Sequence, residues 1–328
     1  MCGIIGISSN KSVSSSIINS LKKLEYRGYD SAGIATLSDG LINEVKSEGR
    51  VENLENNFDL KNLAGNIGIG HVRWATHGVP NSVNAHPHSS ENVSVVHNGI
   101  IENSTLLKKY LLSKGHKFKS QTDTEVIVHL ITENLKTSEL QEAITKTLKQ
   151  LHGSFALGII FKDMPDLIIG ARRGSPLAVG YGPNENYLGS DSYALKSMTN
   201  KISYLDDGEL CVLTKDQINF YDENLKIVAD WKFYLIAFGL NDSTIKYENI
   251  DISYYNTEGI SSNQTELAQN EREKVLRELL PYRVRLYFEN NRKYLVKLET
   301  IKNQSLPLVI YTLSVNLLVK VIKLILLI

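Results

Sequence analysis

The chain opens with MCGIIGI (1–7), in which Cys2 is followed directly by an apolar, strand-like run. One interpretation is that Cys2 is a small apolar residue at the start of a core strand, because free cysteine packs as a small hydrophobe. The other is that Cys2 is a nucleophile. If Met1 is removed, the α-amine of Cys2, with a reference pKa of about 8, can take the thiol proton and later deliver it to a leaving group.

Length and composition bound the class of protein. The 328 residues include 36 basic and 36 acidic side chains, and this length predicts two domains. No long basic stretch is present, which argues against nucleic acid as a partner. The two cysteines, Cys2 and Cys211, do not make a disulfide scaffold, and the start of the chain lacks a signal-peptide pattern. We therefore expect a reducing, cytoplasmic setting, in which a reactive thiol survives.

Hydrophobic spacing predicts helices between two groups of strands. Strands are expected at 3–8, 33–37, 66–72 and 92–97, and in six segments between 154 and 222. Helices are expected at 13–24, 106–111, 122–131 and 140–151. Ser12 is the expected cap of the first helix, and TDTE (122–125) is a capping box for the third. Strands at both ends with helices between them predict stacked sheets covered by helices.

The character of the sequence changes near residue 230. The stretch 231–262 has no clear period, and TELAQNEREKVLRELL (265–280) is a charged helical segment closed by Pro281. The last residues are very apolar, but their uninterrupted part, 306–319, is shorter than the roughly 20 residues that cross a bilayer. We therefore favour a buried helix or a non-native tail over a membrane anchor.

The segment VSVVHNGIIEN (93–103) places Asn98 and Gly99 directly after a predicted strand. Asn-Gly between apolar runs is typical of a tight hairpin turn. Alternatively, the pair is an oxyanion site, in which the Asn98 amide and the Gly99 backbone N–H donate to the oxyanion that a cysteine nucleophile creates at an amide. On the residues alone we favour the turn.

An amino-acid substrate needs a cation for its carboxylate and an anion for its ammonium group. Arg73, in GHVRWATHG (70–78), has the planar guanidinium that suits a carboxylate. Asp123, at the start of the predicted third helix, can face the ammonium group. Its alternative role is that of an acid that complements the helix dipole.

Five of the eight histidines lie between residues 71 and 97: His71, His77, His86, His88 and His97. Their spacing matches no zinc-ligand pattern, and no cysteine lies nearby, so we expect no metal. The chain also lacks the glycine-rich motifs that bind nucleotide phosphates, and we expect no cofactor.

A family resemblance now becomes visible in segments that occur in order: MCGIIGI, LEYRGYDSAG, GHVRWATHG, NAHPH, VVHNGIIEN, SQTDTEV, ARRGSPL and GSDSYAL. Over residues 2–225 they resemble the class II glutamine amidotransferase domain of the glutamine–fructose-6-phosphate aminotransferases (isomerising). The resemblance implies an α+β fold, the four-layer αββα sandwich of N-terminal-nucleophile hydrolases, followed here by an irregular or helical tail.

The resemblance also implies roles for individual residues. Cys2 matches the nucleophile, and Asn98 and Gly99 match the oxyanion hole. Arg73 and Asp123 match the residues that hold the glutamine carboxylate and amine. Three further residues of the Arg73 loop match the pocket lining: Trp74, Thr76 and His77. The implied activity is hydrolysis of L-glutamine to glutamate and ammonia, and the implied assembly is a homodimer.

The chain departs from this family after residue 225. Family members continue into two sugar-isomerase domains that bind fructose 6-phosphate, but residues 226–328 contain no recognisable counterpart of their S-Q-S-G-E-T loops. We therefore expect a glutaminase of hexosamine biosynthesis truncated before the isomerase domains, which uses fructose 6-phosphate only if those domains are supplied elsewhere. The alternatives are a non-functional remnant of a disrupted gene and a free glutaminase that supplies ammonia to another acceptor.

Overall fold

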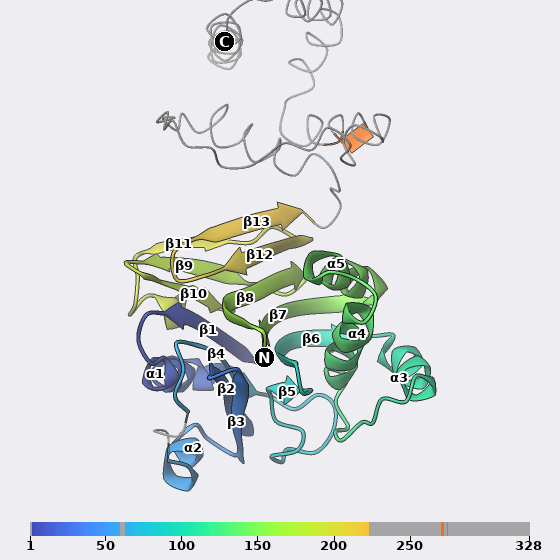
Figure 1. Cartoon of the computed structure of the whole chain (residues 1–328). Helices are drawn as coiled ribbons and strands as arrows, with labels where there is room; N and C mark the ends of the chain where they lie inside the picture. The colour runs from blue at the N-terminus through green and yellow to red at the C-terminus, as the bar shows by residue number, and fades with distance from the viewer. Residues whose placement is uncertain (1, 60–62, 223–269, 272–273, 275–328) are drawn as a thin grey trace, which may run out of the picture. The chain divides into compact units, whose positions relative to one another are not determined.

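The computed structural model describes residues 2–59, 63–222, 270, 271 and 274. The chain divides after Asn224, and the unit before this point is the one described below. Within it, two antiparallel sheets lie face to face, with helices on their outer sides (Figure 1). The predicted four-layer αββα sandwich is confirmed. The domain end at residue 225 stays a prediction, and the predictions for the tail lie outside the described residues.

The first sheet has seven strands in the order β11-β9-β10-β1-β4-β2-β3, and every neighbouring pair is antiparallel. Its strands are β1 (Gly3–Ser9), β2 (Ser31–Ser38), β3 (Leu41–Glu48), β4 (Ile67–Arg73), β9 (Ala178–Gly182), β10 (Glu185–Gly189) and β11 (Lys201–Tyr204). The apolar run after Cys2 forms β1, which lies in the middle of the sheet between β10 and β4. The position of β1 places Cys2 at one end of the sheet, beside the end of β4.

The second sheet has six strands in the order β13-β12-β8-β7-β6-β5. Its strands are β5 (His88–Ser89), β6 (Val93–Ile101), β7 (Gly153–Phe161), β8 (Met164–Arg173), β12 (Glu209–Leu213) and β13 (Ile218–Asp222). Residues on both faces of β6 and β7 are buried, as expected for strands covered by a second sheet on one side and by helices on the other.

Three apolar layers hold the sandwich together. Between the sheets, Ile4 and Ile69 of the first sheet share a core with Val96 and Ile160 of the second. On the outer side of the first sheet lie α1 (Ser14–Leu24), the 3₁₀ turn η1 (Glu25–Arg27), α2 (Glu52–Asn57) and α6 (Ser192–Leu195). On the outer side of the second sheet lie α3 (Ser104–Ser113), α4 (Glu125–Leu135) and α5 (Leu140–Gln150) (Figure 1). Each fully buried Leu or Ile contributes roughly 1.5–3 kcal/mol.

The Asn98-Gly99 pair is not a turn, and the hairpin interpretation is wrong. Strand β6 runs through both residues to Ile101, and they pair with Ala156 and Phe155 of β7. Gly99 has a φ of +135°, and a Cβ there would lie 2.1 Å from the carbonyl oxygen of Ser154. Only glycine fits this position, because both the left-handed φ and the close approach exclude a side chain.

Both predicted helix caps are also wrong. Helix α1 begins after Val13, and the Ser12 hydroxyl lies 3.3 Å from that of Ser14 instead of capping the helix. Helix α4 begins at Glu125, so TDTE is not a capping box around Thr122. The elements that the sequence patterns missed are short or edge elements: β3, β5, β11, α2 and α6. In the described ranges, no helix combines the length and the apolar character needed to span a membrane.

Candidate active site

Cys2 lies at the start of β1, and its atoms contact three separate segments of the chain. The thiol Sγ accepts a hydrogen bond from the backbone N–H of Trp74 at 3.3 Å. The backbone carbonyl of Cys2 accepts one from Arg27 Nε at 2.9 Å and one from Asn98 Nδ2 at 3.1 Å. Burial raises the pKa of the thiol, and the Trp74 hydrogen bond and the charge of Arg73 only partly oppose this. The resting group is therefore a thiol, which needs a base before it can attack.

Asn98 is held in one orientation by a histidine. Its Oδ1 lies 3.1 Å from His71 Nε2, which also lies 3.0 Å from the carbonyl oxygen of His97. Both partners of this nitrogen are oxygen acceptors, so Nε2 carries the proton and donates. The Asn98 amide oxygen is thus occupied, and its NH₂ group faces Cys2.

Behind Asn98 lies a group of four buried histidines, which we call the histidine core: His71, His86, His88 and His97. The His86 ring lies 4.2 Å from that of His71 and 4.8 Å from that of His88. Burial lowers the pKa of all four, to about 3 for His71 and His88, so they are neutral near pH 7. Among the described residues, no group of three or more His, Cys, Asp or Glu side chains is arranged to hold a metal ion.

Arg73 ends β4, and its guanidinium is buried beside Cys2. Its Nη2 donates to the carbonyl oxygen of His77, whereas its Nη1 is buried and has no hydrogen-bond partner within the part of the chain that the structure describes. Burial lowers the pKa of Arg73, and nearby Asp30 and Asp123 act in the opposite direction. A buried N–H without an acceptor costs free energy, so this group is a ready donor for a substrate carboxylate.

Asp123 lies just before α4 and is fixed to the strand that carries Asn98. Its Oδ2 accepts the backbone N–H of Ile101 at 2.7 Å, and its Oδ1 lies 4.0 Å from Nδ1 of His77. The carboxylate is buried, yet Oδ1 faces the partly exposed His77 ring. An ammonium group of a ligand is a suitable partner for that oxygen.

The loop after β4 carries the other predicted pocket residues, Trp74, Thr76 and His77, which are all exposed. The Trp74 ring lies edge-on to Tyr29 at 6.0 Å, while its backbone contacts Cys2. The Thr76 hydroxyl lies 3.3 Å from His77 Nδ1. The structure therefore brings every predicted site residue to one region, where Cys2 is in direct contact with both Asn98 and Trp74.

Three further residues of the site were not predicted. Arg27 donates to Cys2, Asp30 accepts the backbone N–H of Ala75, and His71 orients Asn98. The glycine-rich EYRGYDSAG (25–33) was the available signal for the first two. A Cβ on Gly28 would lie 2.6 Å from the carbonyl carbon of Arg73, so glycine permits this close approach.

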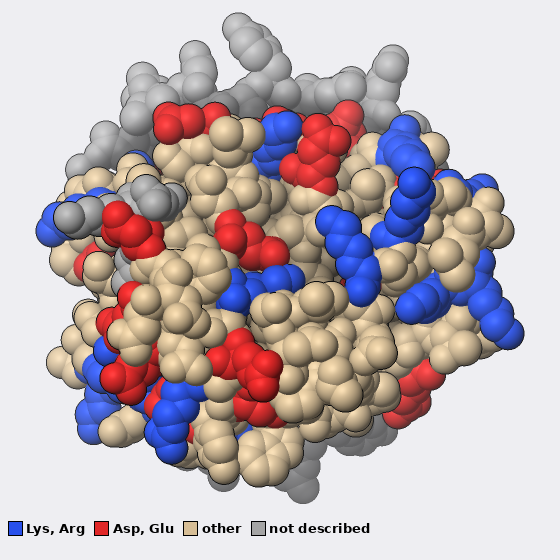
Figure 2. All heavy atoms as spheres, turned by 90° about the horizontal axis from the view of Figure 1, so that it is seen from below, with Lys and Arg blue, Asp and Glu red and all other residues tan. Residues whose placement is uncertain are grey.

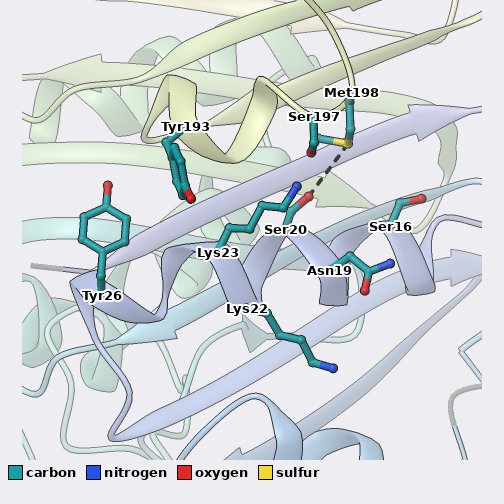
Figure 3. Close-up of a pocket in the computed structure, with 9 residues that line it drawn as sticks. All are labelled: Ser16, Asn19, Ser20, Lys22, Lys23, Tyr26, Tyr193, Ser197 and Met198. Carbon is teal, nitrogen blue, oxygen red and sulfur yellow. Dashed lines mark hydrogen bonds between the residues drawn. The ribbon is translucent and has the colours of Figure 1, made fainter.

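On the face shown in Figure 2, basic side chains gather towards the right-hand edge, and acidic and basic side chains are interspersed over the rest of the described surface. A separate groove of about 1170 Å³ lies between α1 and α6, and Lys23 extends along it towards Ser20 (Figure 3). None of the predicted site residues lines this groove, so it is not part of the candidate site.

The chain is similar to a protein-family model, to the sequences of curated proteins and to solved structures. A family model described as "glutamine amidotransferase domain" matches residues 71–197. Glutamine–fructose-6-phosphate aminotransferase (isomerising) of Zymomonas mobilis is 52% identical over 229 residues, 70% of this chain and 38% of the relative. The Mesorhizobium japonicum enzyme of the same name is 52% identical over 223 residues, 68% of this chain and 37% of the relative.

Two solved structures are similar to this chain at lower sequence identity. The glutamine phosphoribosylpyrophosphate amidotransferase of B. subtilis has a TM-score of 0.60 and 26% identity, with 74% of this chain and 54% of that chain covered. A structure described as the allosteric regulatory enzyme of purine biosynthesis has a TM-score of 0.61 and 25% identity, with the same coverage. The chain spans 38% or less of the length of the curated relatives above.

Proposed function

Since this chain carries a glutamine amidotransferase domain of the N-terminal-nucleophile fold, homologous to the N-terminal domain of glutamine–fructose-6-phosphate aminotransferases, we propose that Cys2 hydrolyses L-glutamine to glutamate and ammonia. The observation that carries the proposal is the Asn98 amide, which donates to the Cys2 backbone and is held in that orientation by His71. An oriented amide donor beside a cysteine is what an oxyanion hole requires.

The reaction begins with removal of the thiol proton. Processing must expose the α-amine of Cys2, which then acts as the base. The thiolate attacks the side-chain carbonyl carbon of glutamine, and a carbon–sulfur bond forms. The resulting oxyanion accepts hydrogen bonds from Asn98 Nδ2 and the Gly99 backbone N–H. The ammonium form of the amine returns the proton, the carbon–nitrogen bond breaks, and ammonia leaves.

Water completes the cycle. It attacks the thioester with the same amine as base, the carbon–sulfur bond breaks, and glutamate and the free thiol are released. During both steps Arg73 Nη1 holds the α-carboxylate and Asp123 Oδ1 holds the α-ammonium group of the substrate. Trp74, Thr76 and His77 line the side of the pocket that is open to solvent.

The direct test replaces each cysteine in turn. Cys2→Ala is expected to abolish glutamine hydrolysis and to leave glutamine binding intact, because the binding groups remain. Cys211→Ala is the matched control, because Cys211 is a fully buried thiol in β12 that packs in the apolar core between the sheets. Ordinary turnover in Cys2→Ala would refute the mechanism. A folded wild-type chain without turnover would favour the alternative of a non-functional remnant.

The printed name of the relatives suggests one acceptor for the ammonia. Their name assigns fructose 6-phosphate as the acceptor, whereas this chain matches little more than a third of their length. We propose that amino-sugar synthesis in hexosamine biosynthesis requires isomerase domains from elsewhere, and that this chain alone releases ammonia to solvent. A free glutaminase with another acceptor is the alternative. A homodimer and a reducing, cytoplasmic location complete the proposal.

A further inference from the structure

The turn 119–123 carries Asp123 and has no helix or strand of its own. The turn is hydrogen-bonded to the side chain of Glu125, the first residue of α4. Glu125 is only 6% exposed. One carboxylate oxygen accepts the backbone N–H of Lys119 at 2.8 Å. The other accepts the backbone N–H and the hydroxyl of Ser120, at 2.6 and 2.7 Å.

Glu125 is ionised under ordinary conditions. Burial raises the pKa of its carboxyl, but hydrogen bonds from His129, Lys119 and Ser120 outweigh burial and lower it to about 2. Both oxygens are therefore acceptors, and each is used by the turn. Charge-assisted hydrogen bonds of this kind are about twice as strong as neutral ones.

Residues 119–123 also contact the loop that follows Arg73, through hydrogen bonds between Gln121 and Asn84. The backbone N–H of Gln121 donates to Asn84 Oδ1 at 2.9 Å, and Asn84 Nδ2 donates to Gln121 Oε1 at 3.3 Å. The same Nδ2 donates to the carbonyl oxygen of Val79 at 3.0 Å. The Arg73 guanidinium is bound to the carbonyl of His77 in this loop. Contacts therefore run from Glu125, through the turn, to both groups that we assign to the ends of glutamine.

We propose that Glu125 is a positioning residue for glutamine, which fixes Asp123 towards the ammonium group and the Arg73 loop towards the carboxylate. This inference rests on the proposed function, because it assigns the same pocket.

The alternative is that Glu125 only stabilises the start of α4, as an acid near a helix N-terminus does. The contacts argue against this. All its backbone N–H partners belong to the turn and none to α4, and its one contact within the helix is His129 Nε2 at 3.5 Å. The carboxylate therefore acts on the turn.

The experiment measures glutamine affinity by calorimetry on the full chain, in a Cys2→Ala parent that does not consume the ligand. Glu125→Gln keeps the shape but places an NH₂ group against backbone donors, and we expect the Kd of glutamine to rise about tenfold or more, on the scale of one lost charge-assisted bond. Glu133→Gln is the matched control on the same helix, because Glu133 contacts His116 and Lys136 instead of the turn. Its Kd should equal that of the parent.

The outcomes separate the two hypotheses. A purely structural role would lower the melting temperature of Glu125→Gln without changing Kd, which would overturn the proposal. If Glu125→Gln does not fold, Ser120→Ala removes one donor to the carboxylate, together with the contacts of that hydroxyl with Thr122, and leaves the carboxylate itself. It should raise Kd by a smaller factor. An unchanged Kd in Ser120→Ala would then overturn the proposal. If the Cys2→Ala parent itself does not bind glutamine, the proposed function fails instead.

Discussion

Acid is expected to destabilise the domain in a pH range where carboxylates do not yet titrate, because the histidine core is buried in its neutral form. His71 and His88 have a pKa of about 3 in the folded chain, against 6.5 for an ordinary histidine. Between these values the unfolded chain binds more protons than the folded chain. Stability is therefore full above pH 6.5 and falls as the pH drops towards 3.

The magnitude follows from the two pKa values. Between pH 7.5 and pH 5, each histidine that protonates only on unfolding removes about 2 kcal/mol of unfolding free energy. His71 and His88 together therefore remove about 4 kcal/mol, and His86 and His97 act in the same direction. A typical domain has about 5–15 kcal/mol in total, so the effect is easily measured. Glu125, with a pKa of about 2, adds its own effect only at lower pH, where carboxyl groups protonate.

The assay is urea unfolding of the full chain, followed by far-ultraviolet circular dichroism at pH 7.5 and pH 5. His88→Gln should reduce the difference between the two pH values by about 2 kcal/mol, because one titrating group of the core is gone. His152→Gln is the control, since His152 is exposed on the loop before β7 and should leave the difference unchanged. Equal stability of the wild-type chain at both pH values would refute the reasoning.

Three further results are expected. Asn98→Ala should lower turnover by about 10²–10³, through loss of one oxyanion donor, and the lost hydrogen bonds to Cys2 and His71 should lower the melting temperature by too little to explain that loss; activity lost only in proportion to stability would contradict the role. Arg73→Ala should weaken glutamine binding by roughly 2–5 kcal/mol in calorimetry, because a buried carboxylate loses its cation, and an unchanged Kd would exclude Arg73 from the pocket. Fructose 6-phosphate should neither bind the chain nor stimulate its glutaminase activity, and detection of an amino-sugar product would show that residues 226–328 form a substrate domain.

Many of the strands and helices could be predicted from the sequence, because the hydrophobic patterns that indicate them lie within short contiguous segments. The apolar run after Cys2, the helical spacing of Ile17 and Leu21, and the strand pattern of 154–161 are properties of contiguous residues, and each became the predicted element. The order of the motifs around Cys2, Arg73 and Asn98 carried a family resemblance, and the resemblance implied a nucleophile, a carboxylate partner and an oxyanion donor. These three roles stay predictions.

Tertiary structure decided what depends on pairing between distant segments. The Asn98-Gly99 dipeptide favours a hairpin turn locally, but the backbone ladder with β7 extends β6 through it. In the sequence His71 is one histidine among five, and only the stacking of β4 on β6 brings its Nε2 to the Asn98 amide oxygen. Glu125 looks like half of a capping box, and its real partners are two backbone groups before the helix. Local sequence patterns were enough to predict the four longer helices and most of the strands, and they supplied the reactive side chains. Sheet order and stacking determined which of these elements and side chains meet, because those contacts join residues far apart along the chain.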